Sequence, residues 1–473
     1  MLMMTTSREA FARPVSDTEI VPHITKPLPT TVRPVLPRLR TLKTFNLPPA
    51  RVEEVLLSAS SMLPTPTSEL LGSHPLRILV APSGFKESLG PEQVADAIEA
   101  GIRKVLDEKS IIARKLPLHD GGEGFARALV AAHDGKIVEK WVNGPTGLPV
   151  HSHLGFVGEC GDTAVLDMAA AAGLRLVPKD ARDPTVTTTY GVGELMREAL
   201  DAGSKKIIVG CGDSGTSDGG AGMLQALGVR LLDANGVELP RAGGGRSLLK
   251  LDKICWKGVH PRLRENAVDK VHIEAVCNTT NVLCGPQGVA RIYGPQKGAT
   301  SSDVDVLATA LDQLSLVARA VLGRNIGRAP GSGASGGLGA GLMLLGARLR
   351  ARSEAINEYF EFDRVFEQHW DFVITAEGSL DGQSTQGKMT TEVARRAKRN
   401  GAQVVALAGQ IGEGADTTYG AGIKAYTSIL NGPLTLEEAI LQTEALVQDG
   451  AEKVLRMIMV GLALARRHSR SSA

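Results

Sequence analysis

Short apolar runs alternate with polar loops and amphipathic stretches along most of the chain, beginning near residue 76. Residues 76–81 form a short, mostly apolar run of the kind expected for a buried parallel strand. After the loop at 82–89, residues 91–105 place apolar side chains on one helical face, with proline in the first turn. A second strand, loop and helix follow at 114–132. Two such units predict a parallel sheet whose loops gather at the carboxyl ends of the strands.

The pattern changes after residue 136. Strand-like pieces at 137–142, 153–157 and 163–168 are broken by glycine and proline, which indicates a change of domain or an inserted sheet. Further on, 304–321 is the clearest amphipathic helix, two late strands are expected near 372–375 and 404–408, and the end from residue 436 is helical.

The first 75 residues lack such a pattern. They contain eleven of the 24 prolines and neither tryptophan nor tyrosine. A segment of this kind buries too little apolar surface to offset the entropy of ordering it, so we expect disorder, with at most a short helix at 52–62. Glu9, Asp17 and Glu19 argue against an organelle transit peptide, which is normally poor in acidic residues.

A polar glycine loop at 209–228 is the centre of the predicted chemistry. A β-branched run at 207–209 leads into glycines, hydroxyls, Asp213 and Asp218, and an apolar helix follows. Backbone N–H groups and a helix N-terminus in such a loop favour a phosphate, and the hydroxyls and carboxylates can ligate Mg²⁺. The residues expected to bind phosphate here are Gly212, Ser214, Gly215, Thr216, Gly219 and Gly220.

Two other interpretations of this loop remain open. Residues 210–215 match the dinucleotide pattern G-x-G-x-x-G, and Asp233 lies near the expected spacing. Five further polar or glycine residues precede the helix, however, and two carboxylates would repel a pyrophosphate without a cation between them. A tight turn closed by side-chain hydrogen bonds is as plausible as a binding loop. A second glycine run at 331–341, with Gly333, Gly336 and Gly337, is either a phosphate cradle or a site of close helix packing.

Several other loops carry chemistry at predicted strand ends. Asp120, in the loop at 119–124, can ligate Mg²⁺ or accept the proton of an attacking hydroxyl, although capping a helix is as plausible. Lys86, between Ser83 and Ser88, can pair with a phosphate or a carboxylate. Glu377, Asp381 and Lys388 form a similar glycine-rich group, and Lys297 adds one basic side chain to the turn at 294–300.

Composition narrows the class of protein. The formal net charge is +2 in 473 residues and no basic stripe is visible, which argues against nucleic acid as a partner. Five scattered cysteines without C-x-x-C spacing indicate reduced thiols in an intracellular protein. The apolar runs are too short to cross a membrane. We therefore expect a soluble, cytoplasmic enzyme that acts on a small phosphate-bearing molecule.

In their order, seven of these loops resemble the motifs of the bacterial-type glycerate kinase family. The family's G-P-Q-K-G-A-T is unchanged at 294–300, and its A-D-G-G-E-G is H-D-G-G-E-G at 119–124. The resemblance covers about 76–412. The remaining matches are D-S-F-K-G-S-L at 82–89, R-x-P with T-x-G-x-G-E-L at 182–195, G-G-S-A-T-N-D-G-G-A-G-M-L-Q-A-L-G at 212–228, P-G-A-G-A-A-G-G-L-G at 330–339 and T-G-E-G-x-x-D-x-Q-S/T-x-x-G-K at 375–388.

The resemblance implies two α/β domains around a cleft, one with a Rossmann-like parallel sheet and one with a mixed sheet. We assign the first domain to 76–135 and 300–470, and the second to an insertion at 136–299. The implied reaction is ATP-dependent phosphorylation of glycerate with Mg²⁺, releasing ADP. Grouped by role, the residues are Lys86, Asp120 and Asp218 for catalysis; Asp120, Asp213 and Asp218 for the metal; Lys297 with the glycine loops for ATP; and Ser83, Ser88, Arg182, Glu377, Asp381 and Lys388 for the substrate.

Four of the chain's departures from the family's motifs remove or add an acidic residue in a loop. Ser83 stands for an aspartate and Glu87 for a glycine, while Asp213 stands for a glycine and Asn278 for an aspartate. One hypothesis is that Asp213 or Glu87 partly replaces the missing charge near Mg²⁺. The alternative to an active sugar-acid kinase is a degenerate member that binds nucleotide or hydroxy acid without efficient turnover.

Overall fold

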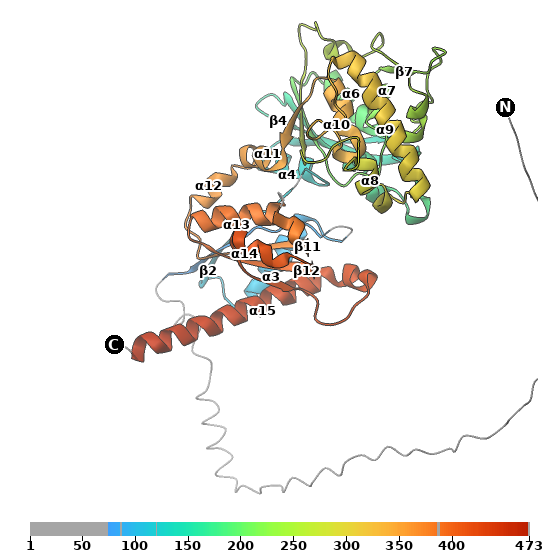
Figure 1. Cartoon of the computed structure of the whole chain (residues 1–473). Helices are drawn as coiled ribbons and strands as arrows, with labels where there is room; N and C mark the ends of the chain where they lie inside the picture. The colour runs from blue at the N-terminus through green and yellow to red at the C-terminus, as the bar shows by residue number, and fades with distance from the viewer. Residues whose placement is uncertain (1–73, 86–87, 120, 386–387, 472–473) are drawn as a thin grey trace, which may run out of the picture. The chain divides into compact units, whose positions relative to one another are not determined.

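The computed structural model describes residues 74–471 apart from 86–87, 120 and 386–387 (Figure 1). Nearly all of the segment predicted to be disordered, including the candidate helix at 52–62, lies outside the described residues. So do Lys86, Glu87 and Asp120. The predictions made for these residues therefore stay predictions.

A five-stranded sheet joins the beginning of the described chain to its end. Its strands run in the order β13-β12-β11-β1-β2, and all four neighbouring pairs are parallel. The two successive strand–loop–helix units predicted for 76–132 provide only β1 and β2. The strands are β1 (Leu76–Val80), β2 (Ile111–Lys115), β11 (Phe372–Leu380), β12 (Gln403–Ile411) and β13 (Ile423–Ser428).

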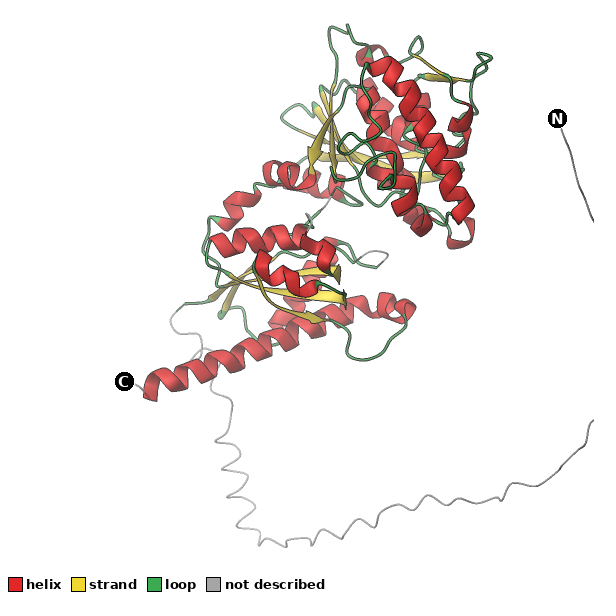
Figure 2. Cartoon of the chain, viewed as in Figure 1, coloured by secondary structure: helices red, strands yellow, loops and turns green. Residues whose placement is uncertain are grey.

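Helices cover both faces of this sheet, so it forms the middle of three layers (Figures 1 and 2). The predicted Rossmann-like parallel sheet is thus present. Alternate residues of β1 point to opposite faces: Ile78 and Val80 belong to one apolar cluster and Leu79 to the other. The first cluster packs under α3 (Pro91–Arg103) and α15 (Leu436–Ser471). The second packs under α12 (Phe362–Phe366) and α13 (Met389–Arg399), near the short α14 (Thr418–Ala421).

A six-stranded mixed sheet forms the centre of the rest of the chain. Its order is β10-β9-β6-β5-β4-β3, with parallel pairs up to β5 and antiparallel pairs from β5 to β3. The predicted combination of a parallel and a mixed sheet is confirmed. The strands are β3 (Lys136–Asn143), β4 (Pro149–Val157), β5 (Thr163–Asp167), β6 (Lys206–Gly210), β9 (His272–Cys277) and β10 (Arg348–Ala351), with a separate hairpin of β7 (Arg230–Leu232) and β8 (Lys253–Cys255).

The two faces of the mixed sheet bury different clusters. Val165, Ile208 and Val276 pack with α4 (Phe125–Ala132) and α11 (Arg352–Tyr359), while Ile207 and Val209 face the larger cluster. The helices of that larger cluster are α5 (Ala169–Ala172), α6 (Tyr190–Asp201), α7 (Ala221–Ala226), α8 (Val289–Tyr293), α9 (Ser301–Leu322) and α10 (Ala334–Leu344).

Some elements that the predicted boundaries place in the first domain pack on the mixed sheet. Because β10 pairs with β9 and the apolar face of α9 enters the mixed-sheet cluster, the elements at 301–351 belong with the mixed sheet. Helix α4, assigned to the parallel sheet, also packs on the mixed one. An amphipathic stripe shows that a helix is buried but not which sheet it covers, so the pattern could not place these boundaries. Among the described residues, no helix combines the length and apolar character needed to cross a membrane.

Candidate functional site

The polar loops of the mixed sheet gather at the carboxyl ends of its parallel strands. Asp167, the last residue of β5, pairs in register with Gly210, the last residue of β6, and β9 runs parallel on the other side of β6. The central glycine loop begins directly after β6. This edge is where α/β sheets usually place ligand-binding loops.

The two glycine loops interlock, as close backbone contacts show. The backbone N–H of Gly219 donates to the carbonyl of Gly336, with an N···O distance of 3.1 Å. A side chain on Gly336 would overlap the carbonyl of Thr216, and a Cβ on Gly337 would lie 2.8 Å from the Cα of Gly219. Ser335, Gly336 and Gly337 are successive left-handed residues, with φ of 50°, 69° and 90°. Close packing therefore explains part of the glycine content, which the sequence alone left open.

Lys297 supports the central loop from inside. Its side chain is buried, and Nζ donates to the Ser214 hydroxyl at 2.9 Å and to the Thr216 carbonyl at 2.6 Å. Burial lowers its pKa to about 7, although the nearby Asp218 acts in the opposite direction. Lys297 therefore holds the loop in shape, and its protonated form adds positive potential behind the predicted phosphate position.

Asp218 occupies a different environment from the one the sequence suggested. Its carboxylate accepts the N–H groups of Thr189, Gly220 and Gly222 at 2.8–3.1 Å, and also the Thr189 hydroxyl. The side chain is buried, which raises its pKa. It therefore caps the start of α7 and ties it to the Thr189 segment. A carboxylate whose oxygens already bind this many protein donors is poorly suited to the catalytic and metal-binding roles predicted for it.

Unlike the Asp218 carboxylate, two hydroxyls of the same loop lack hydrogen-bond partners among the described residues. Within the described part of the chain, Thr216 Oγ1 and Ser217 Oγ are buried and have no hydrogen-bond partner. Buried polar atoms without a partner cost free energy unless a ligand or water satisfies them. The two hydroxyls adjoin the Ser214–Lys297 contact, so they suit the oxygens of a bound phosphate.

Gly122 and Glu123, from the loop at 119–124, pack directly on the central loop. A Cβ on Gly212 would lie 2.6 Å from the Cα of Gly122, and the N–H of Glu123 donates to the Asp213 carboxylate at 3.3 Å. Glu123 forms an ion pair with Arg175, and burial raises its pKa. The structure thus brings two of the sequence-predicted loops together, including Asp213 and the described residues on either side of position 120.

Asp167 is a neighbour that sequence reasoning did not single out. It is fully buried, and burial raises its pKa to about 6. Its carboxylate accepts the backbone N–H of Ala126 at 3.4 Å, in the first turn of α4. The available signal was an aspartate ending an apolar strand, at the same edge as the other loops.

A second group of polar residues lies at the carboxyl ends of the parallel sheet. The connections run outward in opposite directions from β1 and β11, so the strand order reverses between these two strands, the usual place for a ligand. Ser83 follows β1, and its hydroxyl donates to the Ala376 carbonyl on β11 at 2.9 Å. Glu377 is the next residue along β11 and is almost fully buried.

Glu377 is only partly satisfied by its surroundings. Lys388 Nζ lies 3.3 Å from Glu377 Oε2 and 3.6 Å from Asp381 Oδ1, and donates to the Ser384 hydroxyl at 3.0 Å. The other oxygen, Glu377 Oε1, is buried and has no hydrogen-bond partner among the described residues. Burial raises the pKa of this carboxyl against the effect of Lys388. Glu377, Asp381 and Lys388 therefore form one cluster, as their spacing suggested.

Two of the predicted substrate residues lie elsewhere. Ser88 donates its hydroxyl to the Ile440 carbonyl of α15 at 3.1 Å, so it fastens that helix instead of facing a ligand. Arg182 packs beside Gly298, next to the Lys297 turn of the mixed sheet. The predicted substrate set is thus divided between the loops of two sheets.

These loops can be compared with known proteins. The model of the glycerate kinase family matches residues 78–459. The chain belongs to the glycerate kinase family. Glycerate kinase from Bacillus subtilis (strain 168) is 43% identical over 365 residues, covering 77% of this chain and 93% of the relative. Glycerate 2-kinase from Escherichia coli (strain K12) is 41% identical, with the same coverage.

A solved structure agrees. The crystal structure described as a "putative glycerate kinase 2" from Salmonella typhimurium LT2 superposes with a TM-score of 0.65 at 39% identity. It covers 82% of this chain and 99% of the other. The predicted family and enzyme class are therefore confirmed, and the chain is an enzyme of the glycerate kinase family.

The fold explains two departures from the glycerate kinase motifs. Asp213 has φ of 47°, a left-handed conformation that glycine adopts freely and aspartate tolerates better than most residues. Asn278 uses its side-chain oxygen to accept the N–H and hydroxyl of Thr280, at 3.1 and 2.8 Å, in a local turn. An aspartate could make the same turn, so Asn278 preserves the loop while removing a charge.

Proposed function

We propose that this enzyme transfers the terminal phosphoryl group of Mg²⁺-ATP to a hydroxyl of glycerate, giving phosphoglycerate and ADP. The observation that carries the proposal is the interlocked pair of glycine loops with Lys297 behind them, in a chain that belongs to the glycerate kinase family. Phosphoryl transfer chiefly requires positioned phosphates and neutralised charge, which backbone N–H groups and a buried lysine can supply.

The central loop supports the nucleotide half of the proposal. The unpartnered hydroxyls of Thr216 and Ser217 suit phosphate oxygens, and Gly212, Gly215, Gly333, Gly336 and Gly337 let the backbone approach closely. Asp218 and Lys297 act here as supports that fix the loop, instead of as direct ligands.

The residues present also fit the magnesium ion that accompanies ATP. Mg²⁺ in such enzymes needs only one or two carboxylates besides phosphate and water. No cluster of three or more potential side-chain ligands occurs within the described residues, and Asp213 with the loop hydroxyls are the oxygen donors at hand. Asp120 stays a proposed ligand on the resemblance. When bound, the ion would neutralise charge on the phosphates.

The cluster on the parallel sheet supports the acceptor half. We propose that Glu377 accepts the proton of the substrate hydroxyl as the new P–O bond forms and the bond to ADP breaks. A buried carboxylate with a raised pKa and an unpartnered oxygen is suited to this task. Lys388 and Ser83 would orient the substrate, glycerate. The resemblance to the family's motif adds Lys86 to this group.

One assay tests the function. The protein is incubated with Mg²⁺-ATP and D-glycerate, ADP is followed by a coupled enzyme, and the product is identified by phosphorus NMR. We expect one phosphoglycerate for each ADP, and the coupling pattern shows whether the 2- or 3-hydroxyl was used. Heat of ATP or glycerate binding without ADP would instead support the degenerate member.

A further inference from the structure

One aromatic ring touches both ends of the loop at 119–124. Phe360, directly after α11, stacks on His119 with ring centroids 6.5 Å apart and planes at 20°. The same ring meets Phe125 edge-on at 6.3 Å, with planes at 67°. His119 opens the loop and Phe125 follows it as the first residue of α4. Both contacts have the geometries that aromatic pairs prefer.

Residues 121–123, which lie between these contacts, pack closely against the neighbouring loop. A Cβ on Gly210 would lie 2.7 Å from the Gly121 carbonyl oxygen, and one on Gly212 would lie 2.6 Å from the Cα of Gly122. The Glu123 N–H also donates to Asp213. A shift of a few tenths of an ångström in this loop would therefore be transmitted to the start of the central glycine loop.

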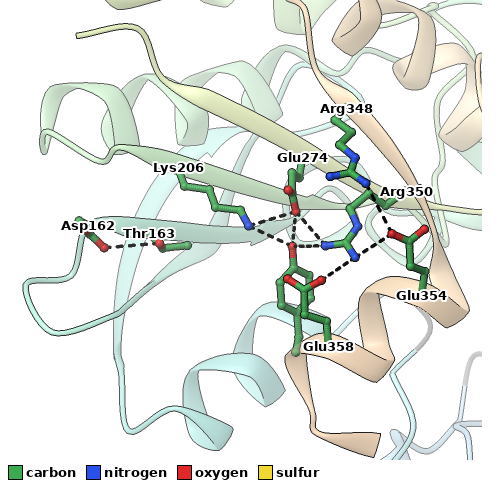
Figure 3. A network of polar contacts seen from close by, with 9 residues as sticks. Asp162, Thr163, Lys206, Glu274, Arg348, Arg350, Glu354 and Glu358 are labelled. Atoms are coloured by element: carbon green, nitrogen blue, oxygen red, sulfur yellow. Dashed lines mark hydrogen bonds and ion pairs between the residues drawn. The ribbon is translucent and has the colours of Figure 1, made fainter. Parts of the chain in front are cut away.

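Phe360 is itself held by the residue before it. Tyr359 donates its hydroxyl to Glu274, whose carboxylate also pairs with Lys206 at 3.1 Å and Arg350 at 3.3 Å. Figure 3 shows Lys206, Glu274 and Arg350 converging, and Arg350 also pairing with Glu354 and Glu358. These contacts fasten the end of α11 to β6, β9 and β10.

His119 completes the arrangement from the other side. Its side chain is buried, and Nε2 lies 2.6 Å from the Glu92 carboxylate in the first turn of α3. The family motif quoted above has alanine at this position, so the ring stack on Phe360 depends on a histidine that replaces it in this chain.

We propose that Phe360 is a positioning residue. By contacting His119 and Phe125, which flank the 121–124 backbone, it aligns that backbone with the 211–215 loop. The proposal rests on the proposed function, because that function assigns the phosphates to the central loop. Phe360 acts only through the loop and has no contact with the reacting atoms in this account.

The experiment compares two phenylalanines of one short segment. Phe360→Leu removes the ring from the loop, whereas Phe366→Leu alters α12, where Phe366 pairs with Phe362 at 5.2 Å. Each variant is assayed for kcat, for KM of ATP and glycerate, for thermal stability, and for hydrogen exchange of peptides covering 116–126. Phe360→Tyr keeps the ring and serves as the conservative variant.

We expect Phe360→Leu to lower kcat about tenfold to a hundredfold, as small misalignments of reacting groups do, and to speed exchange in the 116–126 peptides. Phe360→Tyr should keep both kcat and the exchange of these peptides close to those of the wild type. Phe366→Leu should leave the exchange of these peptides unchanged, whatever it costs in stability. Wild-type kcat and exchange in Phe360→Leu, or the same loop effect in Phe366→Leu, would overturn the proposal.

The exchange measurement separates this proposal from the proposed function. If the wild type makes no phosphoglycerate, the function fails, but the loop peptides still show whether Phe360 orders them. If the wild type is active and Phe360→Leu matches it in kcat and exchange, only the positioning role fails.

Discussion

At the scale of single residues, backbone conformation and burial decide which side chains the loops accept. Asp213 and Ser335 adopt left-handed φ in loops otherwise rich in glycine, and Gly336 has no space for a side chain. Burial likewise separates two carboxylates that look alike in the sequence. Both carboxylate oxygens of Asp218 accept hydrogen bonds from the protein, whereas one oxygen of Glu377 has no partner among the described residues.

Gly336→Ala should weaken ATP binding at least about tenfold. The new Cβ would overlap the Thr216 carbonyl, and the left-handed φ adds strain of about 1 kcal/mol. Titration calorimetry with Mg²⁺-ATP measures the effect. Gly346→Ala is the matched control, because Gly346 has a similar φ of 79° and no atom within 4 Å of a Cβ. Equal ATP affinities for both variants would count against the interlocked loops.

The lowered pKa of Lys297 predicts that the stability of the folded protein depends on pH. Burial lowers its pKa from 10.5 to about 7, so between these values the unfolded chain binds a proton that the folded chain does not. The contribution of this group to the free energy of unfolding therefore rises with pH, by about 2–3 kcal/mol from pH 7 to 9. It is smallest below pH 7, where both states are charged.

The comparison is with Lys297→Met, which has a side chain of similar length and no charge. Urea unfolding is measured at pH 7, 8 and 9. The free energy of unfolding of the wild type should rise with pH relative to that of the variant. A constant difference over this range would show that Lys297 stays charged when buried.

At the scale of elements, local sequence signals set helix ends, whereas contacts set what each helix covers. Thr300 and Asp303 form a reciprocal capping box at the start of α9, with the Thr300 hydroxyl 3.2 Å from the Asp303 nitrogen. The same helix also shows the limit of such signals. Its amphipathic pattern predicts a buried face, but that face packs in the cluster of the mixed sheet, to which β10 also belongs.

Thr300→Ala should lower the free energy of unfolding by about 1 kcal/mol, because it leaves the Asp303 N–H in the first turn of α9 without its side-chain acceptor. Chemical denaturation provides the measurement. Thr309→Ala removes an exposed hydroxyl from the middle of the same helix, where it bonds only the Asp305 carbonyl at 2.9 Å. That control should change stability by less than about 0.5 kcal/mol.

At the scale of the whole molecule, two sets of strand-end loops have different chemistry. The mixed sheet gathers glycines, hydroxyls and Lys297, which suit phosphates. The parallel sheet gathers Glu377, Asp381 and Lys388, which suit a hydroxyl acceptor. If the two sets serve nucleotide and acceptor separately, substitutions in them should have separable effects.

Glu377→Gln tests this separation. The amide cannot accept the hydroxyl proton, so kcat should fall about 10²- to 10⁴-fold, while the affinity for Mg²⁺-ATP stays within about twofold of wild type. Steady-state kinetics and calorimetry measure the two quantities. Glu367→Gln, at an exposed position after α12, serves as the control and should match wild type. Loss of ATP affinity in Glu377→Gln would place the nucleotide at the parallel sheet.

The sequence by itself determined most of the longer strands and the polar loops after them, although not β7, β8, β10 or β13. It also determined the family and the clustering of Glu377, Asp381 and Lys388. These features depend on local periodicity and on short motifs, which neighbouring residues in the chain encode. Only the tertiary structure decided the packing of α9, the capping role of Asp218, the turning of Ser88 toward α15, and the contact of Phe360 with both ends of one loop. Each joins segments far apart in the chain, and a pattern of residue types does not specify which buried partner a side chain meets.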